Sequence, residues 1–196
     1  MKRFIFIPVF IIAIAVLTVI ARPASSLEKP QAQSVEAYFS PDGGIQKRII
    51  DRIDKAKSSI DIAIYSFTSN KVAKALIKAK KRGVAIRVIM DREQFDDEHS
   101  QKNYLEKNEV TIKCLRGKKI PNKAEDDEGT ETKFGSMHHK FIIFDGGGDD
   151  RLLMTGSYNI TESAEKYNYE NIIFITDKPI IQTYQKIFET LWNKRK

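Results

Sequence analysis

Two histidines, a lysine and an aspartate border one short apolar run: His138, His139, Lys140 and Asp145. The run Phe141–Phe144, followed by a glycine-rich turn, predicts a short buried strand that ends at Asp145. Side chains on a strand alternate between its two faces, so His138 and Lys140 project to one side and His139 to the other. This parity selects His138 as the partner of Lys140.

A second polar group follows in the stretch Gly156-Ser157-Tyr158-Asn159. If that stretch is extended, Ser157 and Asn159 share one face. One histidine, one lysine, one serine and one asparagine can then converge on a single site.

These side chains suit the cleavage of a phosphodiester. A neutral imidazole is a competent nucleophile near pH 7 and can form a phosphohistidine, which divides one difficult displacement into two easier ones. The Lys140 ammonium and the Asn159 amide can donate to the non-bridging oxygens, and the Ser157 hydroxyl can complete the cradle. This chemistry needs no metal, and the single cysteine, Cys114, offers no zinc cluster.

The pattern resembles the phospholipase D superfamily, whose hallmark is His-x-Lys-x4-Asp followed by Gly-Ser-x-Asn. More specifically, it looks like the small bacterial nucleases of that superfamily, which carry one motif per chain. The stretches Ala63–Thr68 and Asn168–Asn171 lie where the family has similar runs, and the resemblance covers residues 34–194. The connection from Asp145 to Gly156 is longer than is usual in the family, and its glycines and aspartates predict a lengthened hairpin loop.

The resemblance implies catalytic roles for His138, Lys140, Asp145 and Glu170, and phosphate contacts from Lys140, Ser157 and Asn159, with no metal and no cofactor. Glu170 resembles the acidic residue that orients the family's histidine. A bond to Nδ1 of His138 would leave Nε2 free to attack, whereas the alternative interpretation of Glu170 is a charge at a strand edge. Asp145 ends its strand with the opposite parity to Lys140, so we expect a supporting role, paired with a nearby cation.

The reaction needs a nucleophile and an acid, but the chain offers one catalytic histidine. The resemblance implies a two-fold homodimer in which two copies of the motif share one site. One His138 would attack phosphorus while the other protonates the leaving oxygen and then activates water.

Three functions agree with this set of residues. The first is a non-specific endonuclease that cleaves DNA, with RNA as an alternative substrate, because contacts confined to phosphate carry no sequence information. The runner-up is a phospholipase D-type hydrolase of phosphatidyl lipids. The third is a non-catalytic nucleic-acid-binding protein, although an intact nucleophile argues against it.

The first 26 residues have the composition of a targeting segment. Lys2 and Arg3 precede an apolar run over residues 4–21, and Ala24-Ser25-Ser26 offers a cleavage point. Residues 1–26 are therefore expected to be a signal peptide or an N-terminal membrane anchor, with 27–34 a linker and 35–196 the catalytic domain. The domain would be exported, either periplasmic or secreted, or held at the membrane through residues 4–21.

Hydrophobic patterning predicts an α/β domain. Strands are expected at 35–39, 59–65, 84–90, 110–114 and 171–176, and helices at 45–56, 70–82, 97–107, 160–165 and 180–192. Alternating strands and helices indicate a phospholipase D-like layered fold, with a central mixed or mostly parallel sheet flanked by helices. The segment Leu115–Ser136 has no apolar periodicity and leads into His138, so we expect a long loop that borders the substrate groove.

Net charge permits a polyanionic partner without requiring one. The formal charge of +7 falls to +4 when residues 1–26, which hold three cations and no acid, are removed. Lysines and an arginine line the outer side of the helix predicted at 70–82, and a solvated helix face is the simpler interpretation of them than a nucleic-acid patch.

Overall fold

The computed structural model describes residues 34–121 and 132–194. The predicted signal peptide or anchor, and nearly all of the predicted linker, lie outside these residues. Within the described ranges, none of the helices has the length and apolar character needed to cross a bilayer.

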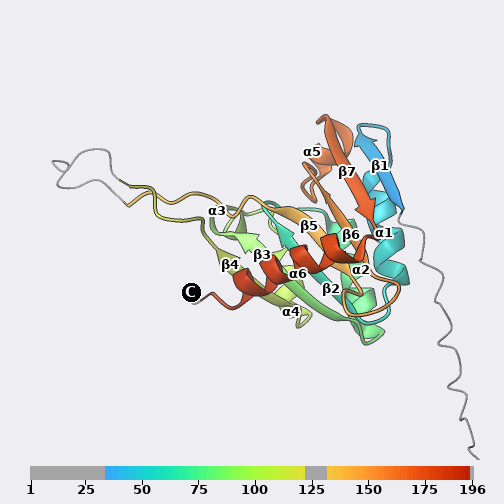
Figure 1. The fold of residues 1–196 in the computed structure, drawn as a ribbon. Coiled ribbons are helices and arrows are strands. Elements are labelled where there is room, and N and C mark those ends of the chain that lie inside the picture. Colours follow the sequence, from blue (N-terminus) through green and yellow to red (C-terminus); the bar gives the residue numbers. More distant parts are fainter. Residues whose placement is uncertain (1–33, 122–131, 195–196) are drawn as a thin grey trace, which may run out of the picture. The chain divides into compact units, whose positions relative to one another are not determined.

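A seven-stranded sheet forms the centre of the domain (Figure 1). Its strands are β1 Val35–Ser40, β2 Ser59–Ile64, β3 Ala85–Asp91, β4 Thr111–Leu115, β5 Lys140–Phe144, β6 Leu152–Gly156 and β7 Glu170–Ile175. The spatial order is β1-β7-β6-β5-β2-β3-β4. The neighbours β2, β3 and β4 run parallel, and the remaining pairs are antiparallel. The predicted layered α/β fold with a mixed sheet is therefore confirmed.

Helices cover both faces of this sheet. They are α1 Ile45–Lys55, α2 Asn70–Lys81, α3 Arg92–Phe95, α4 Lys102–Lys107, α5 Glu162–Lys166 and α6 Lys178–Trp192. Strand β5 shows the layering, since Ile142 and Phe144 pack with α1 and α2 while Phe141 and Ile143 pack with α6. A continuous apolar run is what a strand buried on both faces requires.

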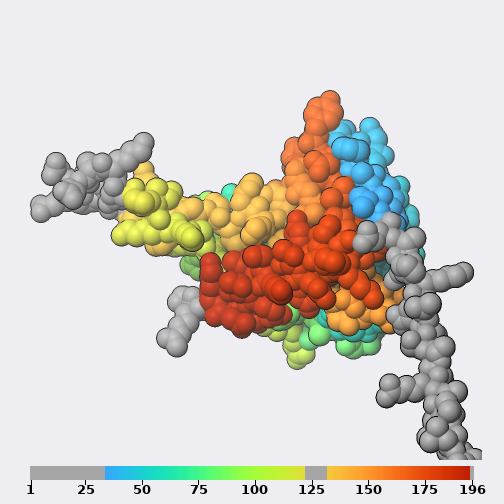
Figure 2. All heavy atoms as spheres, in the orientation of Figure 1, coloured from blue at the N-terminus to red at the C-terminus, as the bar shows by residue number. Residues whose placement is uncertain are grey.

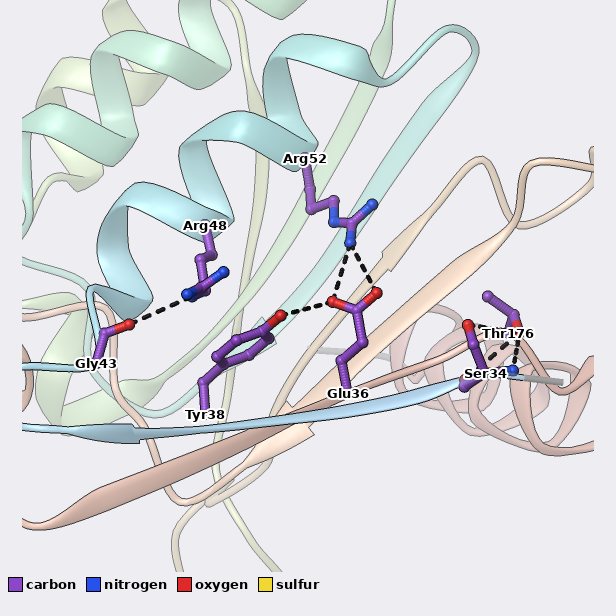
Figure 3. A network of polar contacts seen from close by, with 7 residues as sticks. All are labelled: Ser34, Glu36, Tyr38, Gly43, Arg48, Arg52 and Thr176. Atoms are coloured by element: carbon purple, nitrogen blue, oxygen red, sulfur yellow. Dashed lines mark hydrogen bonds and ion pairs between the residues drawn. The ribbon is translucent and has the colours of Figure 1, made fainter.

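The edge strand β1 is fastened by side chains to α1 (Figure 3). The Glu36 carboxylate accepts from the Tyr38 hydroxyl at 2.7 Å and from the Arg52 guanidinium at 3.3 Å. The Arg48 guanidinium lies 3.7 Å from the centroid of the Tyr38 ring. These contacts hold a strand whose outer edge has no neighbour in the sheet.

Two segments differ from the sequence predictions. The helix expected at 97–107 is shorter, and α3 and α4 flank an irregular stretch. The long loop expected at Leu115–Ser136 contains a narrow two-stranded ribbon, residues 116–121 paired with 132–136, which we call the ribbon. Its pairing includes an antiparallel bridge between Lys119 and Phe134. The prediction missed it because lysines and glycines interrupt the alternation that marks a strand.

Candidate active site

One edge of the sheet gathers most of the residues that the sequence singled out, Asp145 excepted. Ile64 at the end of β2 pairs with Lys140 at the start of β5, and Gly156 at the end of β6 pairs with Ile172 near the start of β7. The turns after β2 and β6 and the segments before β5 and β7 therefore lie side by side.

His138 and Lys140 are in contact at this edge. The Lys140 Nζ lies 3.2 Å from each ring nitrogen of His138 and donates to the His138 carbonyl at 3.1 Å. Lys140 is 8% exposed, whereas the His138 side chain is open to solvent. His139 packs edge-on against Phe141, on the α6 face. The parity argument is confirmed: the sheet pairs Lys140 with His138.

The ring of Tyr65, in the turn after β2, packs beside His138 and Lys140. Sequence reasoning missed this residue. Its ring centroid lies 4.6 Å from that of His138, and the Lys140 ammonium lies 5.3 Å from the Tyr65 centroid. The ring therefore positions the imidazole and offers its π face to the cation. Tyr65 lies in a stretch that the resemblance included, but the strand pattern there gave no reason to single it out.

Asp91, at the end of β3, is a second missed residue. It is 1% exposed, and its Oδ2 accepts from the backbone N–H of Met137 at 2.7 Å. Because Met137 precedes His138, this buried carboxylate fixes the backbone that carries the histidine. An acid directly after an apolar strand was the available signal.

Burial lowers the pKa of Lys140, and the negative charge of Glu170 partly opposes that effect by raising it. A lysine whose charge is poorly solvated gains more from a phosphate anion than a surface lysine does. The site therefore favours a dianionic or monoanionic group beside Lys140.

The Asn159 amide is held in one orientation. Its Oδ1 accepts from the backbone N–H of Ser66 at 3.2 Å, as expected for a carbonyl oxygen. In the described part of the chain no acceptor takes the Asn159 NH₂ group, which leaves it as a donor. An NH₂ group so placed is what the expected phosphate contact of Asn159 requires.

Glu170 and Ser157 are paired with each other. The Ser157 hydroxyl donates to Glu170 Oε2 at 2.5 Å, and the Asn168 amide donates to Oε1 at 3.1 Å. The expected bond from His138 to Glu170 is not among the contacts of this carboxylate within the described residues. Strand β6 lies between β5 and β7, so the Glu170 carboxylate meets Ser157 at the end of β6 before it can reach β5.

Asp145, which the resemblance grouped with the catalytic residues, lies at the far end of β5 from Lys140. It is buried, and its carboxylate accepts from the backbone N–H groups of Lys57, Ser58 and Ser59 and from the Ser58 hydroxyl, at 2.6–3.1 Å. The groups that donate to it thus come from the turn between α1 and β2 and the start of β2. The expected pairing with the side chain of a cation is not among these hydrogen bonds. The supporting role that we expected for it is structural.

Within the described ranges, no cluster of three or more His, Cys, Asp or Glu side chains has the arrangement of a metal site. The chemistry available at this edge is that of an imidazole nucleophile beside an ammonium group, with an amide donor at the same edge. Such a set can attack a phosphorus atom and hold the oxygens around it.

Known proteins share the sequence pattern and the fold of this chain. Residues 49–192 match the family described as "Cardiolipin synthase, PLD-like domain". The phospholipase D of Rickettsia prowazekii is 31% identical over 159 residues, which are 81% of this chain and 68% of that protein.

Two solved structures match over nearly their full length. NucT from Helicobacter pylori is 26% identical, with a TM-score of 0.65 over 80% of this chain and 95% of NucT. Nuc from Salmonella typhimurium, a phospholipase D family member, is 27% identical, with a TM-score of 0.65 over 82% of this chain and 95% of Nuc. With its His138 and Lys140 pair at the edge of this sheet, the chain belongs to the phospholipase D superfamily and is a phosphodiesterase hydrolase.

Proposed function

We propose that the chain is a metal-independent endonuclease that hydrolyses the phosphodiester bonds of DNA, and of RNA as a second substrate, through a phosphohistidine at His138. The observation that carries the proposal is the solvent-open His138 imidazole held 3.2 Å from the buried ammonium of Lys140. A nucleophile and a cation so placed can meet one phosphate from the same side.

The choice of nucleic acid is supported by the likeness to Nuc and NucT, whose structures are each matched over 95% of their length. The sequence also resembles the single-motif bacterial nucleases of the superfamily. Lys140 and Asn159 contact phosphate only in this scheme, so we expect little sequence preference.

We also propose that two copies form one site on a two-fold axis. One His138 attacks phosphorus while the bond to the leaving oxygen breaks, and the second copy's protonated imidazole gives that oxygen a proton. Water then attacks the phosphohistidine, its proton returns to the second imidazole, and the P–N bond breaks. Lys140 and Asn159 hold the non-bridging oxygens throughout. Glu170, engaged by its own chain's Ser157, would orient the second copy's imidazole.

A phospholipase D-type activity is the second candidate, favoured by the name of the Rickettsia relative and by the family description. The apolar run at residues 4–21 supports our further proposal that the domain is exported, with or without a retained anchor. The third candidate, nucleic-acid binding without catalysis, leaves the His138 and Lys140 pair without a use.

The test is plasmid cleavage by residues 27–196 in excess EDTA, beside the His138→Ala protein. The range includes the compact unit Gln33–Lys196. We expect EDTA-resistant nicking that falls by at least about 1,000-fold in the variant, the order of loss for a missing nucleophile. If the folded wild type leaves DNA and RNA intact but releases headgroups from phosphatidylcholine vesicles, the lipid candidate takes its place. Salt-dependent DNA binding with no hydrolysis of any diester would favour the third.

A further inference from the structure

The ribbon, residues 116–121 and 132–136, has no part in the proposed chemistry. Its strands are joined by hydrogen bonds from Ile120 N–H to the Lys133 carbonyl and from Gly135 N–H to the Lys118 carbonyl, both at 2.9 Å. It leaves the sheet beyond β4 and β5, as Figures 1 and 2 show, and its second strand runs directly into Met137 and His138. The base of the ribbon therefore adjoins the active-site edge.

Every charged side chain of the ribbon is a cation. The four are Arg116, Lys118, Lys119 and Lys133, and all are exposed. No carboxylate among the described residues forms an ion pair with them. The segment between the two strands, which holds the acids Glu125–Glu128 and Glu131 and the cation Lys123, lies outside the described ranges and is no part of the surface considered. Four cations on a thin projection attract a polyanion strongly.

Two large apolar side chains are also exposed on the ribbon, Ile120 at 47% and Phe134 at 40%. Residues that pair across two strands share a face, so Phe134 lies beside Lys119 on one face and Ile120 beside Lys133 on the other. The Arg116 guanidinium lies 5.3 Å from the Phe134 ring centroid. Each face therefore combines a positive charge with an apolar surface.

A hollow of about 460 Å³ connects the ribbon to the body. It lies against the end of β3, and the charged residues in its lining are Arg92, Arg116 and Lys133 together with Asp91 and Glu93. Cations of the ribbon and of the body therefore share this hollow.

We propose that the ribbon is a nucleic-acid-binding arm, an inference that rests on the proposed nuclease function. Its cations would contact backbone phosphates, while Phe134 and Ile120 would contact sugars or bases. A two-stranded ribbon has the width that a duplex major groove admits. Lys133 is five residues before His138, at most about 17 Å of extended chain, which corresponds to roughly five base-pair steps.

The distribution of apolar residues favours nucleic acid over a membrane. A hairpin that enters a bilayer gathers its apolar side chains on one side, away from its charges. Here Ile120 and Phe134 lie on opposite faces, each beside a lysine. Phosphates and the stacked bases between them offer charge and apolar surface at the same short spacing.

The test compares two variants of equal charge change in the full chain, solubilised in non-ionic detergent. One is Lys118→Gln/Lys119→Gln/Lys133→Gln on the ribbon, and the control is Lys74→Gln/Lys78→Gln/Lys81→Gln on the exposed side of α2. Both carry His138→Ala, so that fluorescent oligonucleotides stay intact while their anisotropy is measured over a range of salt concentrations.

We expect the ribbon variant to bind at least about tenfold more weakly than the chain without the lysine substitutions. The plot of log K against log salt should also be less steep, its slope smaller in magnitude by about 2 to 3, the value for three lost phosphate contacts. The α2 control should change the slope by less than about one. Equal slopes in the two variants would overturn the arm. So would a ribbon variant that binds normally and merely self-associates, since lysines on an exposed edge also prevent pairing between molecules.

The same substitutions with His138 intact separate this inference from the proposed function. Hydrolysis of bis(p-nitrophenyl) phosphate should be unchanged in the ribbon variant, because so small a diester does not extend to the ribbon, whereas DNA cleavage below saturation should fall with binding. A wild type that hydrolyses the small diester but neither binds nor cleaves nucleic acid refutes both proposals. Normal DNA cleavage by the ribbon variant refutes the arm alone. A ribbon variant that binds DNA normally and loses only its binding to cardiolipin vesicles does the same.

Discussion

At the scale of single residues, one hydrogen bond fixes the orientation of the Asn159 amide and so supports the donor role that we propose for it. Its oxygen accepts from the Ser66 N–H, so its nitrogen is the atom left for a substrate. An aspartate in this position would keep the Ser66 bond and replace the donor with a negatively charged oxygen.

The Asn159→Asp protein should therefore fold normally and lose at least about 100-fold in kcat/KM on a phosphodiester, since removal of one preorganised donor costs that much and charge repulsion adds to it. Steady-state kinetics on bis(p-nitrophenyl) phosphate measure the effect. Asn108→Asp, at the end of α4 and away from the site, is the control for added charge. Similar losses in both variants would refute the donor role.

Lys140 and Glu170 offer a second test at this scale. Burial lowers the pKa of Lys140, and the Glu170 charge raises it. Glu170→Gln removes the raising influence alone, so the pKa of Lys140 should fall further and the ammonium should deprotonate at lower pH than in the wild type. NMR titration of the Lys140 side chain measures this directly, with Glu106→Gln as a distant control. An unchanged or higher pKa would mean that Glu170 does not act on Lys140.

At the scale of elements, the two ends of strand β5 carry residues with different tasks, one for the proposed chemistry and one for stability. Lys140 is at its start, and Asp145 follows its end. Burial by itself would raise the pKa of Asp145, but the hydrogen bonds from Ser58, Ser59 and Lys57 outweigh it and hold that pKa below its ordinary value. A carboxyl group with a lowered folded-state pKa stabilises the protein above about pH 4, and this contribution disappears as the pH falls through the folded-state value.

Asp145→Asn should thus lower the free energy of unfolding by about 2 kcal/mol at pH 7, because hydrogen bonds to a charged acceptor become bonds to a neutral one. Asparagine tolerates the positive φ of 49° at this position. Urea titrations should show the difference shrinking as the pH is lowered below about 4, and kcat should change less than about twofold. A large loss of kcat in a folded variant would return Asp145 to the catalytic set.

Much of β5 could be predicted from the sequence, because the features that define it depend only on neighbouring residues. The apolar run, the parity of His138 and Lys140 and the lengthened hairpin after Asp145 all follow from a period of two and from turn residues. The partners of Asp145 and Glu170 could not be read, because they depend on which strands lie side by side. The sequence does not say that β6 separates Glu170 from β5.

At the scale of the whole molecule, the proposed site is incomplete in one chain. A single His138 can attack phosphorus, but a second proton-transfer group is needed for the leaving oxygen. In the described residues the other histidines are His139, which packs against Phe141, and His99, which is exposed and pairs with Glu98. A second copy, related by a two-fold axis, would supply the missing imidazole and bring two lysines and two asparagines to one phosphate.

A shared site makes activity depend on pairs of subunits rather than on single chains. When wild type and His138→Ala are mixed in equal amounts and allowed to exchange subunits, only about a quarter of the dimers hold two histidines. DNA cleavage per total protein should then fall to about a quarter of that of the wild type, and separate tags on the two chains can verify that mixed dimers have formed. If each chain carried its own complete site, half of the activity would survive. Activity that declines linearly with the wild-type fraction in fully exchanged samples would therefore show that one His138 suffices for both proton transfers.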